Sequence, residues 1–261
     1  MTLTFFKYQG TGNDFVIMDN REGNIHLLEE SVKAICDRRF GIGADGLMLL
    51  NTKTGYDFEM KYYNADGKEG SMCGNGGRCL TQFAYDLGIH KDSYHFIASD
   101  GEHIAEMGNN GWVHLKMIDV DEVTDIHGDS ILNTGSPHLV KLVENLEDLN
   151  VFEEGSSIRY SKPFEEKGIN VNFVENEGKY IRVRTYERGV EDETYSCGTG
   201  VTASALIFAH NSHGFNRVQI QTKGGNLAVE FEKIDDNSFK NIWLCGPATF
   251  VFKGTIDLTP D

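Results

Sequence analysis

Two short motifs in this chain are nearly identical, and each places a cysteine directly before a segment that can form a helix. One is Cys-Gly-Asn-Gly at residues 73–76, and the other is Cys-Gly-Thr-Gly at residues 197–200. Helix-compatible sequence follows each motif, at residues 77–87 and 201–210. Backbone N–H groups and the helix dipole at such a position favour an anion and lower the pKa of a thiol. Two such thiols in matching places indicate a pair that works on one substrate.

The cysteine motifs belong to a longer internal repeat. Tyr-Asn-Ala-Asp-Gly at residues 63–67 corresponds to Tyr-Glu-Arg-Gly at residues 186–189, and Cys73 corresponds to Cys197, which lies 124 residues later. This spacing is far too long for a solenoid repeat. The repeat predicts two homologous half-domains that meet near residues 117–122. We expect residues 1–118 to carry Cys73, residues 119–250 to carry Cys197, and residues 251–261 to return to the first half.

The hydrophobic pattern predicts many short strands and few helices. Residues 58–62 and 180–185 alternate between apolar and polar side chains, as half-buried strands do. Residues 29–38 and 136–149 have helical spacing of apolar side chains. We therefore expect an α+β fold with two pseudosymmetric half-domains, each a curved mixed β-sheet around a central helix that carries the cysteine.

Charge and cysteine content exclude several classes of function. The chain has 24 basic and 40 acidic side chains and a formal net charge of −16, which repels nucleic acids and anionic membranes. No segment approaches the roughly 20 apolar residues of a membrane span, and the first residues lack a signal-peptide pattern. We expect a cytoplasmic protein. Five cysteines without a Cys-x-x-Cys pair predict neither a disulfide scaffold nor a metal site, and we expect Cys36, Cys79 and Cys245 to be buried.

Two facing thiols can form a redox disulfide, bind a metal, or act as acid and base on opposite faces of one carbon. The third chemistry fits best, because inversion of a stereocentre needs proton removal on one face and proton delivery on the other. A thiol with a reference pKa of ~8.5 can serve in either state near neutral pH. Two thiolates about 7 Å apart would repel by roughly 2–3 kcal/mol. We therefore expect one thiolate and one thiol at rest.

The backbone beside each cysteine is expected to have a second task. The N–H groups of Gly74, Asn75, Gly198 and Thr199 can bind a carboxylate at the two helix ends. They would stabilise the charge that develops on this carboxylate when a carbanion forms. This arrangement replaces part of what an electron-sink cofactor does, and we expect no cofactor.

The motifs resemble those of diaminopimelate epimerase, a pyridoxal-independent amino-acid racemase, and the resemblance covers nearly the whole chain in order. It includes Gly-Thr-Gly-Asn-Asp-Phe at 10–15, Gly-Ile-Gly-Ala-Asp-Gly at 41–46, Gly-Ser-Pro-His at 135–138, Gly-Ile-Asn at 168–170, the Tyr-Glu-Arg-Gly segment and both cysteine motifs. The resemblance implies interconversion of LL- and meso-diaminopimelate on the route to lysine and peptidoglycan precursors. It implies that Cys73 and Cys197 are the two bases of a cytoplasmic, cofactor-independent homodimer.

The resemblance also implies a set of substrate contacts. They carry over to Asn13, Asn64, Gly74, Asn75, Asn170, Glu187, Arg188, Gly198 and Thr199, while His138 and Glu187 are expected to tune the thiol pKa values. Arg188 can hold the distal carboxylate of the substrate as a charge-assisted fork, and Glu187 can pair with the distal ammonium group. The substrate is a small zwitterion without net charge, which suits an acidic protein.

Two departures from the family pattern and two alternative functions remain open at the level of sequence. Ser136 stands where many members have asparagine, and Gly46 stands where some have glutamine. A related racemase of histidine or of proline type shares the cysteine motifs, although proline racemases usually have histidine where Asn75 stands. A protein that uses Cys73 and Cys197 as a reversible disulfide, without catalysis, is a more remote alternative.

Overall fold

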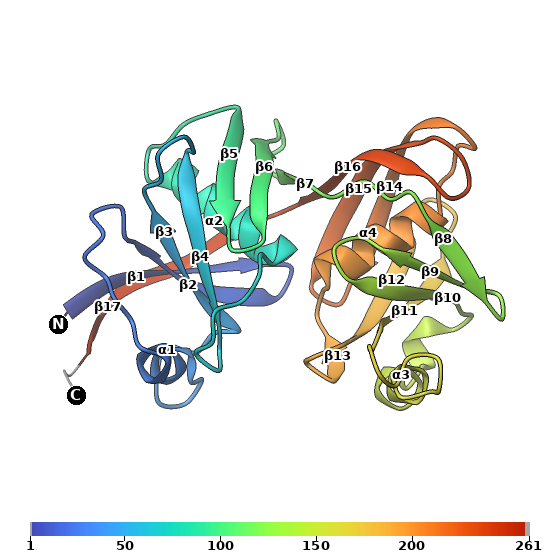
Figure 1. Ribbon diagram of the computed structural model, residues 1–261, viewed down its shortest axis with the longest axis horizontal. Helices are drawn as coiled ribbons and strands as arrows, with labels where there is room; N and C mark the ends of the chain where they lie inside the picture. Colours follow the sequence, from blue (N-terminus) through green and yellow to red (C-terminus); the bar gives the residue numbers. More distant parts are fainter. Residues whose placement is uncertain (1, 259–261) are drawn as a thin grey trace. The chain divides into compact units, whose positions relative to one another are not determined.

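The computed structural model describes residues 2–258, and its strands and helices divide into two compact units. Unit 1 contains the chain up to residue 115 together with the segment that starts at residue 247, and unit 2 contains residues 116–246. Residues 259–261, which the sequence assigned to the returning segment, lie outside the described residues. Figure 1 shows that β17, the last strand, runs beside β1, the first.

Unit 1 combines strands from both ends of the chain with helices from its first half. In chain order its elements are β1 (Thr2–Gly10), β2 (Asn13–Asp19), α1 (Glu29–Cys36), β3 (Gly46–Asn51), β4 (Phe58–Asn64), α2 (Gly74–Asp86), β5 (Ser93–Ala98), β6 (Gly101–Met107), β7 (Val113–Lys116) and β17 (Thr249–Asp257). Strand pairing is antiparallel for β17–β1, β1–β2, β3–β4, β5–β6 and β6–β7, and parallel for β2–β3 and β4–β5. Unit 1 is therefore a mixed sheet.

Unit 2 has a similar order of elements, with a 3₁₀ turn and one short strand in addition. They are β8 (Val123–Ile126), β9 (Asp129–Asn133), β10 (Pro137–Leu142), a 3₁₀ turn (Leu146–Asp148), α3 (Val151–Arg159), β11 (Asn170–Asn176), β12 (Ile181–Glu187), β13 (Asp192–Thr194), α4 (Gly198–Ile207), β14 (Gly214–Thr222), β15 (Gly225–Lys233) and β16 (Phe239–Gly246). In this unit β10–β11 and β12–β14 are parallel, while β8–β9, β9–β10, β11–β12, β14–β15 and β15–β16 are antiparallel. The same pairing order in both units is what an internal duplication produces, and the predicted α+β class is confirmed.

Strand register gives a residue-by-residue correspondence between the units. In unit 1 the parallel pair β2–β3 sets Phe15 opposite Gly46. In unit 2 the parallel pair β10–β11 sets His138 opposite Asn170. Because β10 and β11 hold the places of β2 and β3, His138 corresponds to Phe15, Asn170 to Gly46, and Asn172 to Met48.

Each unit has one helix that is enclosed by strands and begins at a motif cysteine. Helix α2 packs on β1, β2, β3, β6 and β17, and helix α4 packs on β9–β12 and β14–β16 (Figure 1). Nearly every residue of α4 is buried, and the hydroxyls of Thr202 and Ser204 bond to backbone carbonyls four residues earlier. A helix without an exposed face belongs in a core. Among residues 2–258, no helix combines the length and apolar character that a membrane crossing requires.

The prediction of a helix at residues 136–149 is wrong. Residues 137–142 form strand β10, a 3₁₀ turn follows, and the helix of this region begins only at Val151. The apolar side chains of this stretch have helical spacing, but β9 and β11 lie on the two edges of β10 and take up its backbone hydrogen bonds. Strand partners that lie far away in sequence decided the conformation of this segment.

Candidate active site

Both motif cysteines are N-cap residues. Cys73 precedes α2 with φ −101° and ψ 131°, and Cys197 precedes α4 with φ −110° and ψ 113°. Their carbonyls accept the first helical hydrogen bonds, from the N–H groups of Gly77 and Val201. The next amides, at residues 74–76 and 198–200, belong to the first helical turn, where N–H groups have no partner within the helix. Each cysteine therefore stands at an end that attracts anions.

In unit 1 the structure brings Cys73 together with two of the predicted contact residues, Asn13 and Asn75. The Oδ1 atom of Asn13 lies 3.5 Å from Sγ of Cys73 and 3.3 Å from Nδ2 of Asn75. Asn75 is oriented in turn by Arg78, whose guanidinium is fully buried and donates to Oδ1 of Asn75 at 3.0 Å. Asn64, at the end of β4, takes part in a turn through its backbone N–H, which donates to Lys68.

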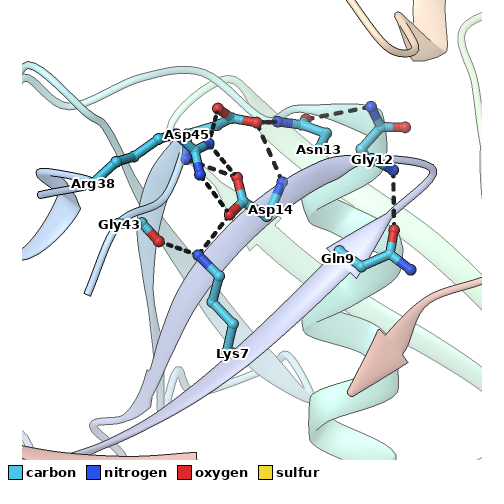
Figure 2. A network of polar contacts seen from close by, with 9 residues as sticks. Lys7, Gln9, Gly12, Asn13, Asp14, Arg38, Gly43 and Asp45 are labelled. Carbon is cyan, nitrogen blue, oxygen red and sulfur yellow. Dashed lines mark hydrogen bonds and ion pairs between the residues drawn. The ribbon is translucent and has the colours of Figure 1, made fainter. Parts of the chain in front are cut away.

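A charged network behind Asn13 fixes the direction of its amide (Figure 2). The Nδ2 atom of Asn13 donates to Asp45 at 2.6 Å, so its oxygen is the atom that faces Cys73. Arg38 bridges Asp45 and Asp14, and Lys7 reaches Asp14 and the carbonyl of Gly43. Burial alone would raise the pKa of the Asp14 carboxyl, but hydrogen bonds from Arg38 and Lys7 outweigh this effect and lower the pKa to about 2.

In unit 2 the structure brings Cys197 together with Thr199, Ser136 and His138. The Oγ1 atom of Thr199 lies 3.4 Å from Sγ of Cys197 and 2.9 Å from Nε2 of His138, which also lies 3.0 Å from Oγ of Ser136. His138 has no exposed surface. Burial, with the positive charge of Arg188 as a second cause, lowers its pKa to about 3, so His138 is neutral near pH 7.

The other predicted residues of unit 2 surround this cluster. The Asn170 amide donates to Ser136 and to the carbonyl of Pro137, and its oxygen accepts from the backbone N–H of Arg188 at 2.9 Å. The Arg188 guanidinium donates to the carbonyl of Lys167. Glu187 ends strand β12 and is half-buried.

The three remaining cysteines lie outside the two Cys-Gly motifs. Cys36, Cys79 and Cys245 are buried, which confirms the sequence prediction. Burial raises the pKa of the Cys79 thiol to about 12 and that of Cys36 to about 11. Thiols that hold their protons this firmly are poor nucleophiles and poor bases at neutral pH.

Sequence reasoning assigned no role to several residues that support the site. They are Lys7, Asp14, Arg38 and Asp45 behind Asn13, Arg78 behind Asn75, and Asn172 behind His138. A signal for Asn172 was present, because Asn170 and Asn172 alternate with the apolar residues Val171 and Phe173 in the first part of the strand. A buried polar side chain needs a hydrogen-bond partner, so such a position indicates a built network.

Comparison with known proteins decides the family. The family model described as diaminopimelate epimerase matches residues 5–121 and 130–251. The chain is 48% identical to the diaminopimelate epimerase of Flavobacterium psychrophilum, over 97% of this chain and 100% of that protein. It belongs to the diaminopimelate epimerase family. It is also 43% identical to the diaminopimelate epimerase of Chlorobaculum tepidum, over 95% of this chain and 99% of that protein. The members of this family are isomerases, and this chain is one of them.

Solved structures with little sequence identity share the fold of this diaminopimelate epimerase family member. A PhzF-family phenazine biosynthesis protein from Bacillus anthracis matches with a TM-score of 0.79 at 16% identity, over 99% of this chain and 100% of that one. A hydroxyproline epimerase from Agrobacterium vitis matches with a TM-score of 0.68 at 12% identity, over 98% and 92% of the two chains. At these identities the likeness concerns the fold alone.

Proposed function

We propose that this epimerase interconverts LL- and meso-2,6-diaminopimelate by a two-base mechanism. One cysteine, as thiolate, removes the proton from the α-carbon, and the other, as thiol, delivers a proton to the opposite face. After turnover the two have exchanged protonation states, and the reverse reaction uses them in exchanged roles. The observation that supports this most directly is that Cys73 and Cys197 are the N-cap residues of corresponding helices in the two units.

The helix ends are suited to the carbanion intermediate. The amides of Gly74 and Asn75 in α2 and those of Gly198 and Thr199 in α4 are proposed to bind the carboxylate at the reacting carbon. As the α-proton leaves, negative charge moves onto this carboxylate, and fixed N–H dipoles stabilise it without reorganising. This stabilisation makes the proposed reaction independent of a cofactor.

We propose that the enzyme selects its substrate by binding the distal carboxylate and ammonium groups. Arg188 is proposed to bind the distal carboxylate, Glu187 the distal ammonium group, and Asn64 and Asn170 both groups, with Asn13 near the reacting carbon. Glu187 and His138 are proposed to tune the thiols. A site built to hydrogen-bond these groups rejects amino acids that lack them, because its polar atoms would then be unpaired.

The proposed substrate also suggests a cellular compartment and a pathway for the enzyme. We place the reaction in the cytoplasm, in the synthesis of lysine and of peptidoglycan precursors. We also propose a homodimer, and the exposed apolar residues on β17 support it. Phe250, Val251 and Phe252 are 46%, 51% and 45% exposed, which is unusual for three consecutive apolar side chains.

Turnover in deuterated water tests the mechanism. LL-diaminopimelate, supplied without any cofactor, is expected to gain one solvent deuterium at one α-carbon as meso product forms, measured by mass spectrometry. Cys73→Ser and Cys197→Ser are each expected to lower kcat/KM by roughly 10²–10⁴-fold or more, while Cys79→Ser is the control that retains activity. Full activity in either of the first two variants contradicts the two-base mechanism, and turnover of histidine or proline in place of diaminopimelate contradicts the substrate.

A further inference from the structure

Unit 2 contains a buried chain of hydrogen bonds that ends at its cysteine. The chain runs from Thr185 on β12 to Asn172 on β11, His138 on β10, Thr199 on α4 and finally Cys197. Successive polar atoms lie 3.0, 3.0, 2.9 and 3.4 Å apart. Thr185, Asn172 and His138 are at most 3% exposed. Four segments that are separate in sequence thus meet in one network.

The direction of the Asn172 amide follows from its partners. Its nitrogen lies 3.0 Å from the carbonyl oxygen of Leu139, which can only accept, and its oxygen accepts from the hydroxyl of Thr185. The same nitrogen lies 3.0 Å from Nδ1 of His138. Asn172 is therefore the donor in this contact, and Nδ1 of His138 is the acceptor. A neutral imidazole whose Nδ1 accepts carries its proton on Nε2.

The proton on Nε2 then directs the hydroxyl of Thr199. His138 donates from Nε2 toward Oγ1 of Thr199 and Oγ of Ser136, at 2.9 and 3.0 Å. The Thr199 hydroxyl can direct its hydrogen to Sγ of Cys197 or to Oγ of Ser136, each 3.4 Å from Oγ1, and Oγ of Ser136 also accepts from Asn170. A thiolate is the stronger acceptor of the two, because hydrogen bonds to charged atoms are the stronger ones.

We propose that Asn172 is a positioning residue for the reaction: it holds His138 in the neutral Nε2–H form, so that the hydroxyl of Thr199 donates to Cys197 and stabilises its thiolate. The inference rests on the proposed role of Cys197 as a base. It concerns a residue that touches neither the thiol nor the expected substrate contacts, and that acts through His138 and Thr199.

The duplicated framework provides an internal comparison. By strand register, Phe15 and Met48 of unit 1 occupy the places of His138 and Asn172, and both are fully buried apolar side chains. The fold therefore does not need a polar network at this position. Cys73 instead contacts the side-chain amide oxygen of Asn13, Oδ1, which can only accept. The two thiols thus have neighbours of opposite hydrogen-bonding character, an acceptor at Cys73 and a donor at Cys197. In α2 the buried Arg78 guanidinium donates to the carbonyl of Gly74, the residue after Cys73.

The first test reads the tautomer of His138 in the unmodified enzyme. Nitrogen NMR of protein labelled at the histidine rings distinguishes a protonated ring nitrogen from a bare one, and His138→Gln assigns the signals. At neutral pH we expect a protonated Nε2 and a bare Nδ1 for His138. A protonated Nδ1 overturns the role of Asn172, whatever the variants do.

The second test follows the two thiols separately. Iodoacetamide alkylates the thiolate, and mass spectrometry of the two cysteine peptides gives a rate for each at one neutral pH. In Asn172→Leu and in Thr199→Val, the rate at Cys197 relative to Cys73 should fall by about three- to tenfold, the worth of one lost hydrogen bond. Thr199→Ser keeps the hydroxyl and should restore the ratio. Thr202→Val, which removes a buried hydroxyl of the same helix outside the network, is the matched control.

These measurements separate the inference from the proposed function. An unchanged alkylation ratio in folded Asn172→Leu, as seen in Thr202→Val, overturns the positioning role even if the enzyme epimerises diaminopimelate through both cysteines. If Cys197→Ser remains active, the proposed function fails, while the tautomer and the alkylation ratio still report whether the network acts on this thiol. Should Asn172→Leu fail to fold, the tautomer in the unmodified enzyme decides.

Discussion

Asp45 accepts a hydrogen bond of 2.6 Å from the side-chain amide of Asn13, and this contact turns the oxygen of Asn13 toward Cys73. Asp45 lies in the loop before β3, while Asn13 begins β2. An exposed carboxylate thus determines which end of the Asn13 amide faces the Cys73 thiol. Because Asn75 donates to the same oxygen, the orientation is determined from two sides.

Removal of the Asp45 carboxylate is expected to reduce activity more than stability. Asp45→Ala frees the Asn13 amide to rotate, and loss of one such contact should lower kcat/KM by about tenfold, near 1.4 kcal/mol. Asp45→Asn retains an oxygen that can accept from Asn13 and should stay close to the unmodified enzyme. Steady-state kinetics measures both. Asp19→Ala, which breaks an ion pair with Arg21 at the end of the same strand, is the control; an equal loss in that variant would mean that Asp45 has no special role.

The second glycine of each cysteine motif is expected to respond differently to alanine. A Cβ atom at Gly200 would lie 2.2 Å from Oδ1 of Asn172, a side chain that buried hydrogen bonds hold in place. A Cβ atom at Gly76 would meet the flexible ends of Met48 and Met60, at 3.3 and 3.4 Å, and would lie at an ordinary contact distance of 3.6 Å from Cβ of Cys73. Gly200→Ala should therefore lose about 2–4 kcal/mol of stability and most activity, whereas Gly76→Ala should lose about 1 kcal/mol or less. Chemical denaturation followed by circular dichroism tests this; equal losses would contradict it.

Acid should weaken the network around Asp14. Its pKa is lowered to about 2 in the folded protein, so the unfolded chain takes up the proton first as pH falls. The stabilisation is complete above pH ~4 and is lost between pH ~4 and ~2, and it amounts to about 2–3 kcal/mol. The difference in free energy of unfolding between the unmodified enzyme and Asp14→Asn should shrink over that range. Urea denaturation at several pH values measures it, with the exposed Asp121→Asn as a control that should show no such trend.

The exposed apolar residues Phe250, Val251 and Phe252 on β17 give a test of the proposed homodimer. Val251→Glu places a charge among exposed apolar side chains and should dissociate the dimer with little effect on the fold, because Val251 is half exposed. Analytical ultracentrifugation of the unmodified enzyme and of the variant reports the mass in solution. Val190→Glu, at a similarly exposed valine of unit 2, serves for comparison. A monomeric unmodified enzyme, or a dimer that survives Val251→Glu, would exclude this surface as the interface.

Features that depend on residues close together in sequence could be predicted from the sequence. The cysteine motifs predicted a helix after each of Cys73 and Cys197, over residues 77–87 and 201–210, since glycine-rich turns and helix-forming segments are recognisable within a few residues. Both helices are confirmed, and they begin slightly earlier, at Gly74 and Gly198. Burial of Cys36, Cys79 and Cys245 followed from their apolar neighbours. The helix expected at 136–149 failed because its residues form a strand between two others, and strand pairing depends on segments far away in sequence.

The sequence by itself determined the repeat, the α+β class, the two cysteine motifs and, through the motifs, the family. Only the tertiary structure decided how each thiol is surrounded. Asn13 presents an oxygen to Cys73 because Asp45 holds its nitrogen, and Thr199 faces Cys197 beside a histidine that Asn172 orients. Composition and spacing reveal which groups are present. The direction of a hydrogen bond depends on which atoms meet across strands and helices, and folding alone brings those atoms together.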